Sequence, residues 1–220
     1  MTKVAYILTP ITFGGSEKVS LNFLKNINRE KYLIHPILLT RPWEDEPYFA
    51  SELGRCQYHY ESIPVAIRKG GDPFRVPRVA KRIYNILNIG SFDILHTHGY
   101  YADICGLPMA NLLRIPSIST CHGFINNDRN LRLYNLLDKM VLRLCRKVIA
   151  VSDGIREDLL LSGLDGSRVE VIRNAVGNDL SENELKRLRH EKRTKLSIGL
   201  DDFVVGFAGR LSEEKGVRYF

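Results

Sequence analysis

The chain alternates short runs of aliphatic and β-branched residues with longer stretches whose hydrophobic residues recur every three or four positions. Short apolar runs bounded by Pro, Gly and polar residues predict buried strands, and the longer spacing predicts helices. Helices are expected to begin near Ser16 and Pro77 and to cover 102–114, 130–146 and 153–162, the last with Ser152 as its cap. Strands are expected over 3–9, 33–40, 57–63, 93–97, 116–121, 148–151 and 169–172.

This alternation is typical of βαβ units, which build a parallel sheet. At least six units fit between residues 3 and 172, enough for a complete doubly wound, Rossmann-like α/β domain. A charged helix over 181–195 and a fresh strand over 203–208 are expected after it. We therefore expect an N-terminal domain over 1–173, a linker with the charged helix over 174–200, and the first strand and phosphate loop of a second, truncated Rossmann-like domain over 201–220. The chain would then be an N-terminal fragment.

Composition places the chain among ordinary globular proteins, since 44% of its 220 residues are hydrophobic and 26% are charged. No apolar run reaches the ~20 residues of a membrane-spanning helix. The first ten residues lack the pattern of a signal peptide, which favours a cytoplasmic protein. Cys56, Cys105, Cys121 and Cys145 form no C-x-x-C pair, so the spacing excludes a zinc ribbon and favours buried thiols over disulfides.

A net charge of +7 favours anionic partners, such as nucleotide phosphates, acidic lipid headgroups or nucleic acid. The basic residues are spread over several segments without the aromatic set of an RNA-binding motif, which argues against nucleic acid. The helix expected over 130–146 carries basic residues near one face and leucines on another. It either packs its leucines in the core, the interpretation we favour, or rests peripherally on the anionic inner face of a membrane.

Glycine and polar residues follow several of the predicted strands. In an open parallel sheet, ligands bind outside the carboxyl ends of the strands, and backbone N–H groups at a helix N-terminus attract anions. The sequence therefore predicts a ligand site, although each position alone also fits a tight turn or a structural hydrogen bond. The positions are Gly14, Gly15, Ser16, His98, His122 and Ser152.

Two further features concern ions. His96 and His98 are spaced to share one face of a strand, but no third ligand has suitable spacing, so we predict no metal site. Arg210 and Lys215 follow the strand expected over 203–208 in a glycine-flanked loop. Arg offers a planar fork and Lys a point charge for phosphate, which predicts an anion site there; two solvated surface cations are the alternative.

Six motifs, taken together and in order, resemble glycosyltransferase family 4, whose members have the GT-B fold. The resemblance covers the whole chain, and 206–216 is its most specific part. It departs at 173–175, where Arg-Asn-Ala replaces the usual Pro-Asn-Gly, and the family's paired-glutamate motif is not among these 220 residues. The motifs are 14–17, 93–99, 119–123, 148–155, 171–176 and 206–216.

The resemblance implies two Rossmann-like domains, with the acceptor mainly on the first and a nucleotide-diphosphate sugar on the second. It implies retention of anomeric configuration, no cofactor and no metal. His122 would lie beside the reacting sugar as the catalytic residue. Arg210 and Lys215 would hold the donor diphosphate, and the acceptor would be a saccharide or a lipid-linked molecule. The phosphate or acceptor loop would comprise Gly14, Gly15 and Ser16, with His98 and Ser152 nearby.

Two other functions fit the same residues. The chain could be a binding module of the same fold that holds an acceptor or partner without turnover, or a nucleotide-sugar epimerase. The fragment itself is expected to be catalytically silent, because half of the donor site would lie outside it.

Overall fold

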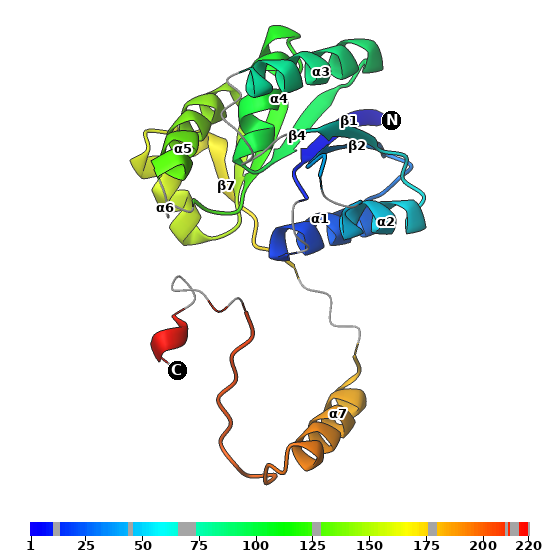
Figure 1. The fold of residues 1–220 in the computed structure, drawn as a ribbon, viewed down its shortest axis with the longest axis vertical. Helices are drawn as coiled ribbons and strands as arrows, with labels where there is room; N and C mark the ends of the chain where they lie inside the picture. The colour runs from blue at the N-terminus through cyan, green and yellow to red at the C-terminus, as the bar shows by residue number, and fades with distance from the viewer. Residues whose placement is uncertain are drawn as a thin grey trace. The chain divides into compact units, whose positions relative to one another are not determined.

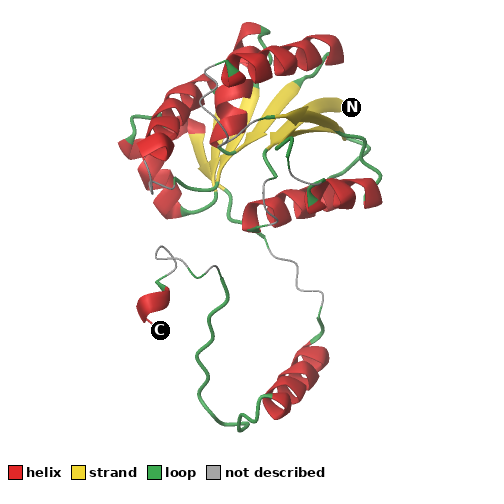
Figure 2. Cartoon of the chain, viewed as in Figure 1, coloured by secondary structure: helices red, strands yellow, loops and turns green. Residues whose placement is uncertain are grey.

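The structure, a computed structural model, describes residues 1–10, 14–43, 46–65, 74–124, 129–175, 180–209, 211 and 216–219, with only the backbone described for 129–131. Contacts divide the chain into two units, Met1–Ala175 and Val176–Phe220. Every strand of the described residues belongs to the first unit (Figures 1 and 2).

Seven strands of the first unit form one parallel sheet, in the order β3-β2-β1-β4-β5-β6-β7. The order of the strands reverses between β1 and β4, which makes this the switch point of the sheet. The parallel α/β sheet predicted from the sequence is confirmed. The strands are β1 (Thr2–Leu8), β2 (Tyr32–Thr40), β3 (Glu61–Pro64), β4 (Ile94–His98), β5 (Ser117–Cys121), β6 (Lys147–Ala150) and β7 (Val169–Val171).

Helices cover the sheet from two sides (Figure 1). Successive side chains of a strand point to opposite faces, so β1 sends Ala5 and Ile7 into one core cluster and Val4, Tyr6 and Leu8 into another. α1 and α2 pack in the cluster that contains Tyr6, whereas α3, α4 and α6 pack in the cluster that contains Ile7. The helices of this unit are α1 (Gly15–Asn26), α2 (Tyr48–Arg55), α3 (Arg75–Gly90), α4 (Tyr100–Leu112), α5 (Arg129–Val141) and α6 (Asp153–Leu161).

Local sequence patterns predicted some helix and strand ends correctly and missed others. Ser152 caps α6 as predicted, because its Oγ accepts a hydrogen bond from the backbone N–H of Ile155 at 3.3 Å. Ser16 does not cap α1: Gly14 is the N-cap, and Ser16 lies in the first turn. The sequence did not predict α2, and β3 begins at Glu61 rather than at residue 57.

The helix expected over 130–146 is shorter than predicted. α5 ends at Val141 and tightens into a 3-10 turn, η1 (Leu142–Leu144). The chain then leaves the helix because the backbone N–H of Arg146 donates to the carbonyl of Ser117 at 2.9 Å, which begins the pairing of β6 with β5. Strand pairing therefore sets where this helix stops.

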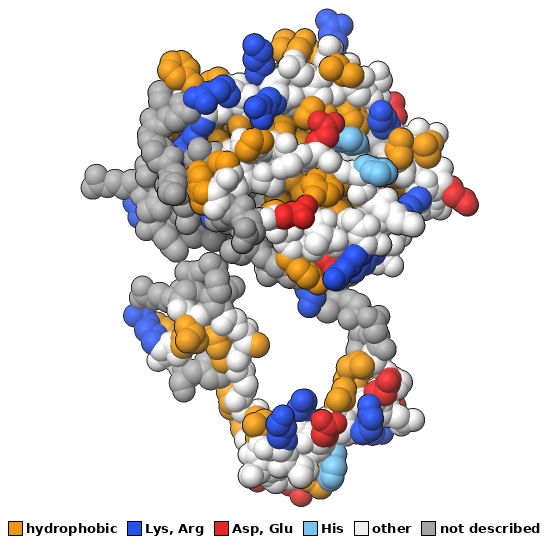
Figure 3. Space-filling model, turned by 45° about the vertical axis from the view of Figure 1, so that its right-hand side comes forward, with side chains coloured by type: hydrophobic (Ala, Val, Ile, Leu, Met, Phe, Trp, Pro, Cys, Tyr) orange, Lys and Arg blue, Asp and Glu red, His pale blue; other side chains and the backbone are white. Residues whose placement is uncertain are grey.

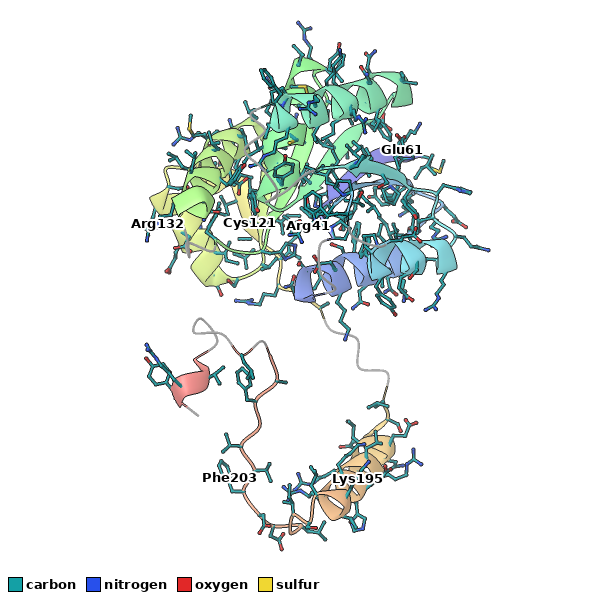
Figure 4. The ribbon with its side chains drawn as sticks, in the orientation of Figure 1. Arg41, Glu61, Cys121, Arg132, Lys195 and Phe203 are labelled. Atoms are coloured by element: carbon teal, nitrogen blue, oxygen red, sulfur yellow. The ribbon has the colours of Figure 1, made fainter. Side chains whose placement is uncertain are left out.

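The second unit contains the predicted charged helix, α7 (Glu182–Lys195). Ser181 caps it, with Glu184 accepting from the backbone N–H of Ser181 at 2.9 Å in return. Figure 3 shows charged side chains at the surface of this helix. The strand expected over 203–208 is absent: the segment is irregular, and Phe203 is 93% exposed (Figure 4). An extended segment becomes a strand only by pairing, and no described strand pairs with it.

The four cysteines are all free thiols. Cys105, Cys121 and Cys145 are buried, as expected from their spacing, whereas Cys56 at the end of α2 is partly exposed. Burial raises the pKa of the Cys105 and Cys121 thiols to about 12 each, so both remain protonated at neutral pH.

Candidate active site

A pocket of about 160 Å³ lies at the carboxyl ends of β1 and β4, where the strand order reverses. Open α/β sheets bind their ligands at this position. The first turns of α1 and α4 and the residue after β5 complete its walls. The lining residues are Leu8, Thr9, Ser16, Glu17, Ser20, His98, Gly99, Tyr100, Tyr101 and His122.

Behind the pocket, aromatic rings from two strands pack against one another. The alternation of β4 places His96 and His98 on the face covered by α1, where they meet Tyr6 of β1. The His98 ring lies 4.5 Å from the ring centroids of both Tyr6 and His96. His96 Nε2 is 2.8 Å from Thr120 Oγ1, and burial lowers the pKa of His96 to about 4. His96 is therefore a neutral, hydrogen-bonded part of the wall.

His98 and His122 form the polar centre of the pocket. His98 Nδ1 lies 3.3 Å from His122 Nε2, so one of these nitrogens donates to the other. Burial lowers the pKa of both rings, well below the usual value for His98, and the Glu17 carboxylate partly counters this effect at His122. Both imidazoles are thus uncharged at neutral pH. Because His122 Nε2 faces His98, the Nδ1 atom of His122 can form a hydrogen bond with a ligand.

The start of α1 forms a second part of the site. Gly14 is the N-cap and supplies no side-chain acceptor, and Gly15 has open space where a Cβ would stand. Glu17 Oε2 accepts hydrogen bonds from the Gly14 backbone N–H at 3.0 Å and from Ser16 Oγ at 2.9 Å. The remaining N–H groups of the first turn and the helix dipole favour an anion at this end.

The structure brings together part of the predicted site. Ser16, His98 and His122 all line the pocket. Gly14 and Gly15 precede Ser16 without lining it, and Ser152, one strand further along, is engaged as the cap of α6. Arg210 and Lys215, predicted to bind the donor diphosphate, lie outside the residues that the structure describes.

Among the other lining residues, the sequence indicated Glu17 only as part of the 14–17 motif and did not indicate Ser20 or Tyr101. Ser20 lies one helical turn after Ser16 on α1, and Tyr101 lies in the first turn of α4. Spacing of three to four residues after a predicted anion-binding turn could have indicated Ser20. Nothing in the local sequence indicated Tyr101, because its place depends on how α4 packs against the sheet.

The opposite face of β4 carries a different polar group, which the sequence did not predict. Thr97, between the two histidines, donates its hydroxyl hydrogen bond to Asp103 of α4. Burial raises the pKa of Asp103 to about 6; burial and the neighbouring Asp103 raise the pKa of Asp138 of α5 to about 9. Asp138 therefore keeps its proton at neutral pH and donates it in a hydrogen bond to Asp103.

Two known proteins match this chain in sequence. The alpha-maltose-1-phosphate synthase of Mycolicibacterium smegmatis is 24% identical over 142 residues, which cover 60% of this chain and 37% of the synthase. An uncharacterized glycosyltransferase of Methanocaldococcus jannaschii is 22% identical over 157 residues, or 66% of this chain and 39% of that protein. The chain thus spans less than half the length of either relative.

Solved structures match the fold. Anabaena HepE in complex with UDP superposes with a TM-score of 0.72 and 19% identity, over 99% of this chain and 56% of HepE. The UDP-GlcNAc 2-epimerase of Methanocaldococcus jannaschii gives a TM-score of 0.57 and 17% identity, over 79% of this chain and 46% of the epimerase. The GT-B class expected for the fold is confirmed by these neighbours.

The model of the family described as Glycosyltransferase Family 4 matches residues 13–179, a range that contains the whole pocket except the end of β1. With the resemblance of its motifs and the doubly wound sheet, this match shows that the chain belongs to glycosyltransferase family 4.

Proposed function

We propose that the intact protein transfers a hexosyl group from a nucleotide-diphosphate sugar to a saccharide or lipid-linked acceptor, with retention of anomeric configuration and without a metal ion. Family membership supports the reaction class. The complexes of Anabaena HepE with UDP and with UDP-glucose support the class of donor. The 220-residue chain, which spans about half of HepE, is expected to be inactive alone.

The observation that carries this proposal is the His98–His122 pair in the pocket at the switch point. Because burial keeps His122 neutral, we expect it to position a sugar hydroxyl through Nδ1 rather than to supply positive charge. His98 fixes the orientation of that ring. A substrate held by a preoriented neutral imidazole loses less entropy on reaching the transition state.

The start of α1 is proposed to stabilise negative charge on a phosphate of the donor or acceptor. Its N–H groups point out of the helix end, and a ligand can approach the backbone at Gly15. Arg210 and Lys215 are proposed to hold the donor diphosphate from the second domain. Fixed donors of this kind act most strongly on the charge that develops as the diphosphate leaves.

The acceptor proton is proposed to pass to the departing diphosphate. Glu17 is a carboxylate in the pocket wall, but its Oε2 already accepts two hydrogen bonds at the start of α1. In the proposed step the bond from the anomeric carbon to the diphosphate oxygen breaks. The acceptor oxygen bonds to the same face of that carbon, and its proton moves to the released phosphate oxygen.

The test is a transfer assay on the intact protein with UDP- and GDP-sugars, with and without saccharide and lipid-linked acceptors. A product with the anomeric configuration of the donor, formed equally well in a chelator, supports the proposal. Inverted product, or loss of activity in the chelator, contradicts retention or metal independence.

A second candidate is nucleotide-sugar epimerisation, because epimerases are among the structural neighbours. Incubating the donor without acceptor distinguishes it: an epimerase converts the sugar, whereas a transferase needs acceptor for net product. Binding of the donor without either reaction would indicate a binding module.

A further inference from the structure

α5 exposes more apolar surface than an ordinary surface helix, and its inner face carries polar as well as apolar residues. Its inner face buries two polar residues, Asn135 and Asp138, the latter against the carboxyl group of Asp103. Its outer face exposes Leu133, Leu136 and Met140, each with 57% of its surface in solvent. The expectation that Leu133, Leu137, Met140 and Leu144 pack in the core is wrong, because all four are exposed. The core side of α5 is formed instead by Tyr134 and Val141 together with the two buried polar residues. Exposed aliphatic side chains in one row indicate an interaction surface.

Basic residues flank this apolar row. Arg132 of α5, labelled in Figure 4, is exposed, and Arg143 and Arg146 are exposed where η1 leads into β6. Leu144, 39% exposed, extends the apolar row beyond Met140. Aliphatic side chains bordered by arginines are the pattern of a helix that lies in the interface of an anionic bilayer.

A basic concavity of about 510 Å³ adjoins the end of this row, at the amino ends of β5, β6 and β7. Leu144 belongs to its lining, together with Arg114, Arg146 and Arg168. Arg168 donates to the carbonyl of Arg143 at 3.0 Å and is thereby held in place. In the described part of the chain, no carboxylate forms a salt bridge with Arg114 or Arg146. These two guanidinium groups are therefore available to an external anion.

We propose that the outer face of α5 and this arginine concavity form a docking surface for an anionic phospholipid bilayer. Leu133, Leu136 and Met140 enter the boundary between headgroups and acyl chains, and Arg114 and Arg146 bind lipid phosphates. The positive charge of this surface is complementary to an anionic leaflet. The apolar row meets the arginine concavity at Leu144. None of the described helices is long and apolar enough to cross a membrane. The proposed contact is made at the bilayer surface. Binding at this surface does not depend on the proposed sugar chemistry.

Vesicle binding of the 220-residue chain tests the proposal. We expect binding to vesicles of phosphatidylcholine with phosphatidylglycerol at least about tenfold tighter than to phosphatidylcholine alone, and weaker at high salt. The double variant Arg114→Glu/Arg146→Glu is expected to bind at least about 25-fold more weakly, since each basic residue at an anionic surface is worth roughly fivefold. Leu136→Gln/Met140→Gln is expected to lose about tenfold or more.

Matched controls lie on α3. Lys81→Glu/Arg82→Glu changes the net charge equally at exposed positions, and Ile89→Gln removes an aliphatic side chain that is 82% exposed. Both controls should bind within about twofold of the parent chain. The proposal is overturned if the chain binds neither kind of vesicle, or if the controls lose as much vesicle affinity as the surface variants. It is also overturned if light scattering shows that the chain dimerises through the apolar row and the chain does not bind vesicles.

Discussion

The two faces of β4 differ in what they do with buried titratable groups. On the face covered by α1, His96 and His98 pack against Tyr6, and His98 lines the pocket. On the opposite face Thr97 hydrogen-bonds to Asp103, beside the protonated Asp138. β4, a strand of five residues, therefore contributes histidines to the site on one face. On its other face it contributes Thr97 to a buried polar contact.

Burial disfavours charge on both faces, but with opposite effects on proton binding. The histidines lose their protons, whereas the carboxyl pair retains one. The imidazole face adjoins an open pocket and so is suited to bind a ligand. The carboxyl face is closed by α4 and α5 and contributes to packing. These two roles should respond differently to substitution and to pH.

The largest effect is expected for His122→Ala in the intact protein. Turnover should fall about 10²- to 10³-fold, because a positioned hydrogen-bonding group at the reacting sugar is lost. The melting temperature should change by less than about 2 °C, since His122 lies at the pocket rather than in the core. His35→Ala, a partly exposed histidine paired with Glu61, is the matched control and should retain activity. A large loss of stability with intact turnover would assign His122 to packing instead.

The carboxyl face should show the reverse pattern in thermal or denaturant unfolding. Asp103→Leu leaves the Thr97 hydroxyl and the Asp138 proton without their acceptor, so it should cost about 2–3 kcal/mol of unfolding free energy. Asp138→Asn keeps a neutral donor of the same shape and should cost less than about 1 kcal/mol. Equal costs for the two substitutions would contradict the assignment of the proton to Asp138.

The pH dependence of stability should distinguish the faces further. The pKa of Asp138 in the folded state, about 9, exceeds its unfolded value, so its contribution is complete below about pH 4 and is lost as the pH rises through 9. The histidine pKa values are lowered, so their contribution is present above about pH 6.5 and is lost as the pH falls toward 4.

Between pH 6.5 and 9 only the Asp138 effect should remain among these groups. The unfolding free energy of the parent protein should fall by about 3 kcal/mol across this window, and that of Asp138→Asn should stay flat. A flat curve for the parent protein would show that Asp138 is already ionised in the native state.

The smallest effect is expected at the start of α1. A Cβ at residue 15 meets no atom within 4 Å, so Gly15→Ala should leave the melting temperature unchanged or slightly raised. Donor or acceptor binding to the intact protein, measured by calorimetric titration, should weaken about tenfold if a phosphate approaches that backbone. Gly54→Ala on α2, also in open space, is the control and should bind normally. Unchanged binding at both positions would remove the α1 start from the site.

Much of the fold followed from the sequence because strands of a buried parallel sheet are nearly continuous apolar runs. Ser152 and Ser181 indicated helix starts correctly, since a cap is a local hydrogen bond. The strand over 203–208 was predicted from the same kind of run and is absent, because strands also need partners. A short helix such as α2 offers too few turns for a periodic pattern.

The candidate site was predictable only where it depends on strand ends. His98 and His122 follow from their places after predicted strands. The Asp103–Asp138 pair joins residues on two helices, and periodicity does not reveal such partners. The same limit explains α5: spacing identified a leucine face, but which face of the helix meets the core depends on contacts with other elements, such as that between Asp138 and Asp103.

The distribution of thiols suits the native chain to site-selective labelling. Cys105, Cys121 and Cys145 are buried. The raised pKa of Cys105 and Cys121 also keeps these two thiols protonated, so little reactive thiolate forms. A maleimide dye added to the native chain near neutral pH should therefore couple at Cys56 first. The native sequence thus offers one preferred attachment point for a fluorophore. Delayed labelling of the other three would report the opening of the α4–α5 side of the sheet in real time.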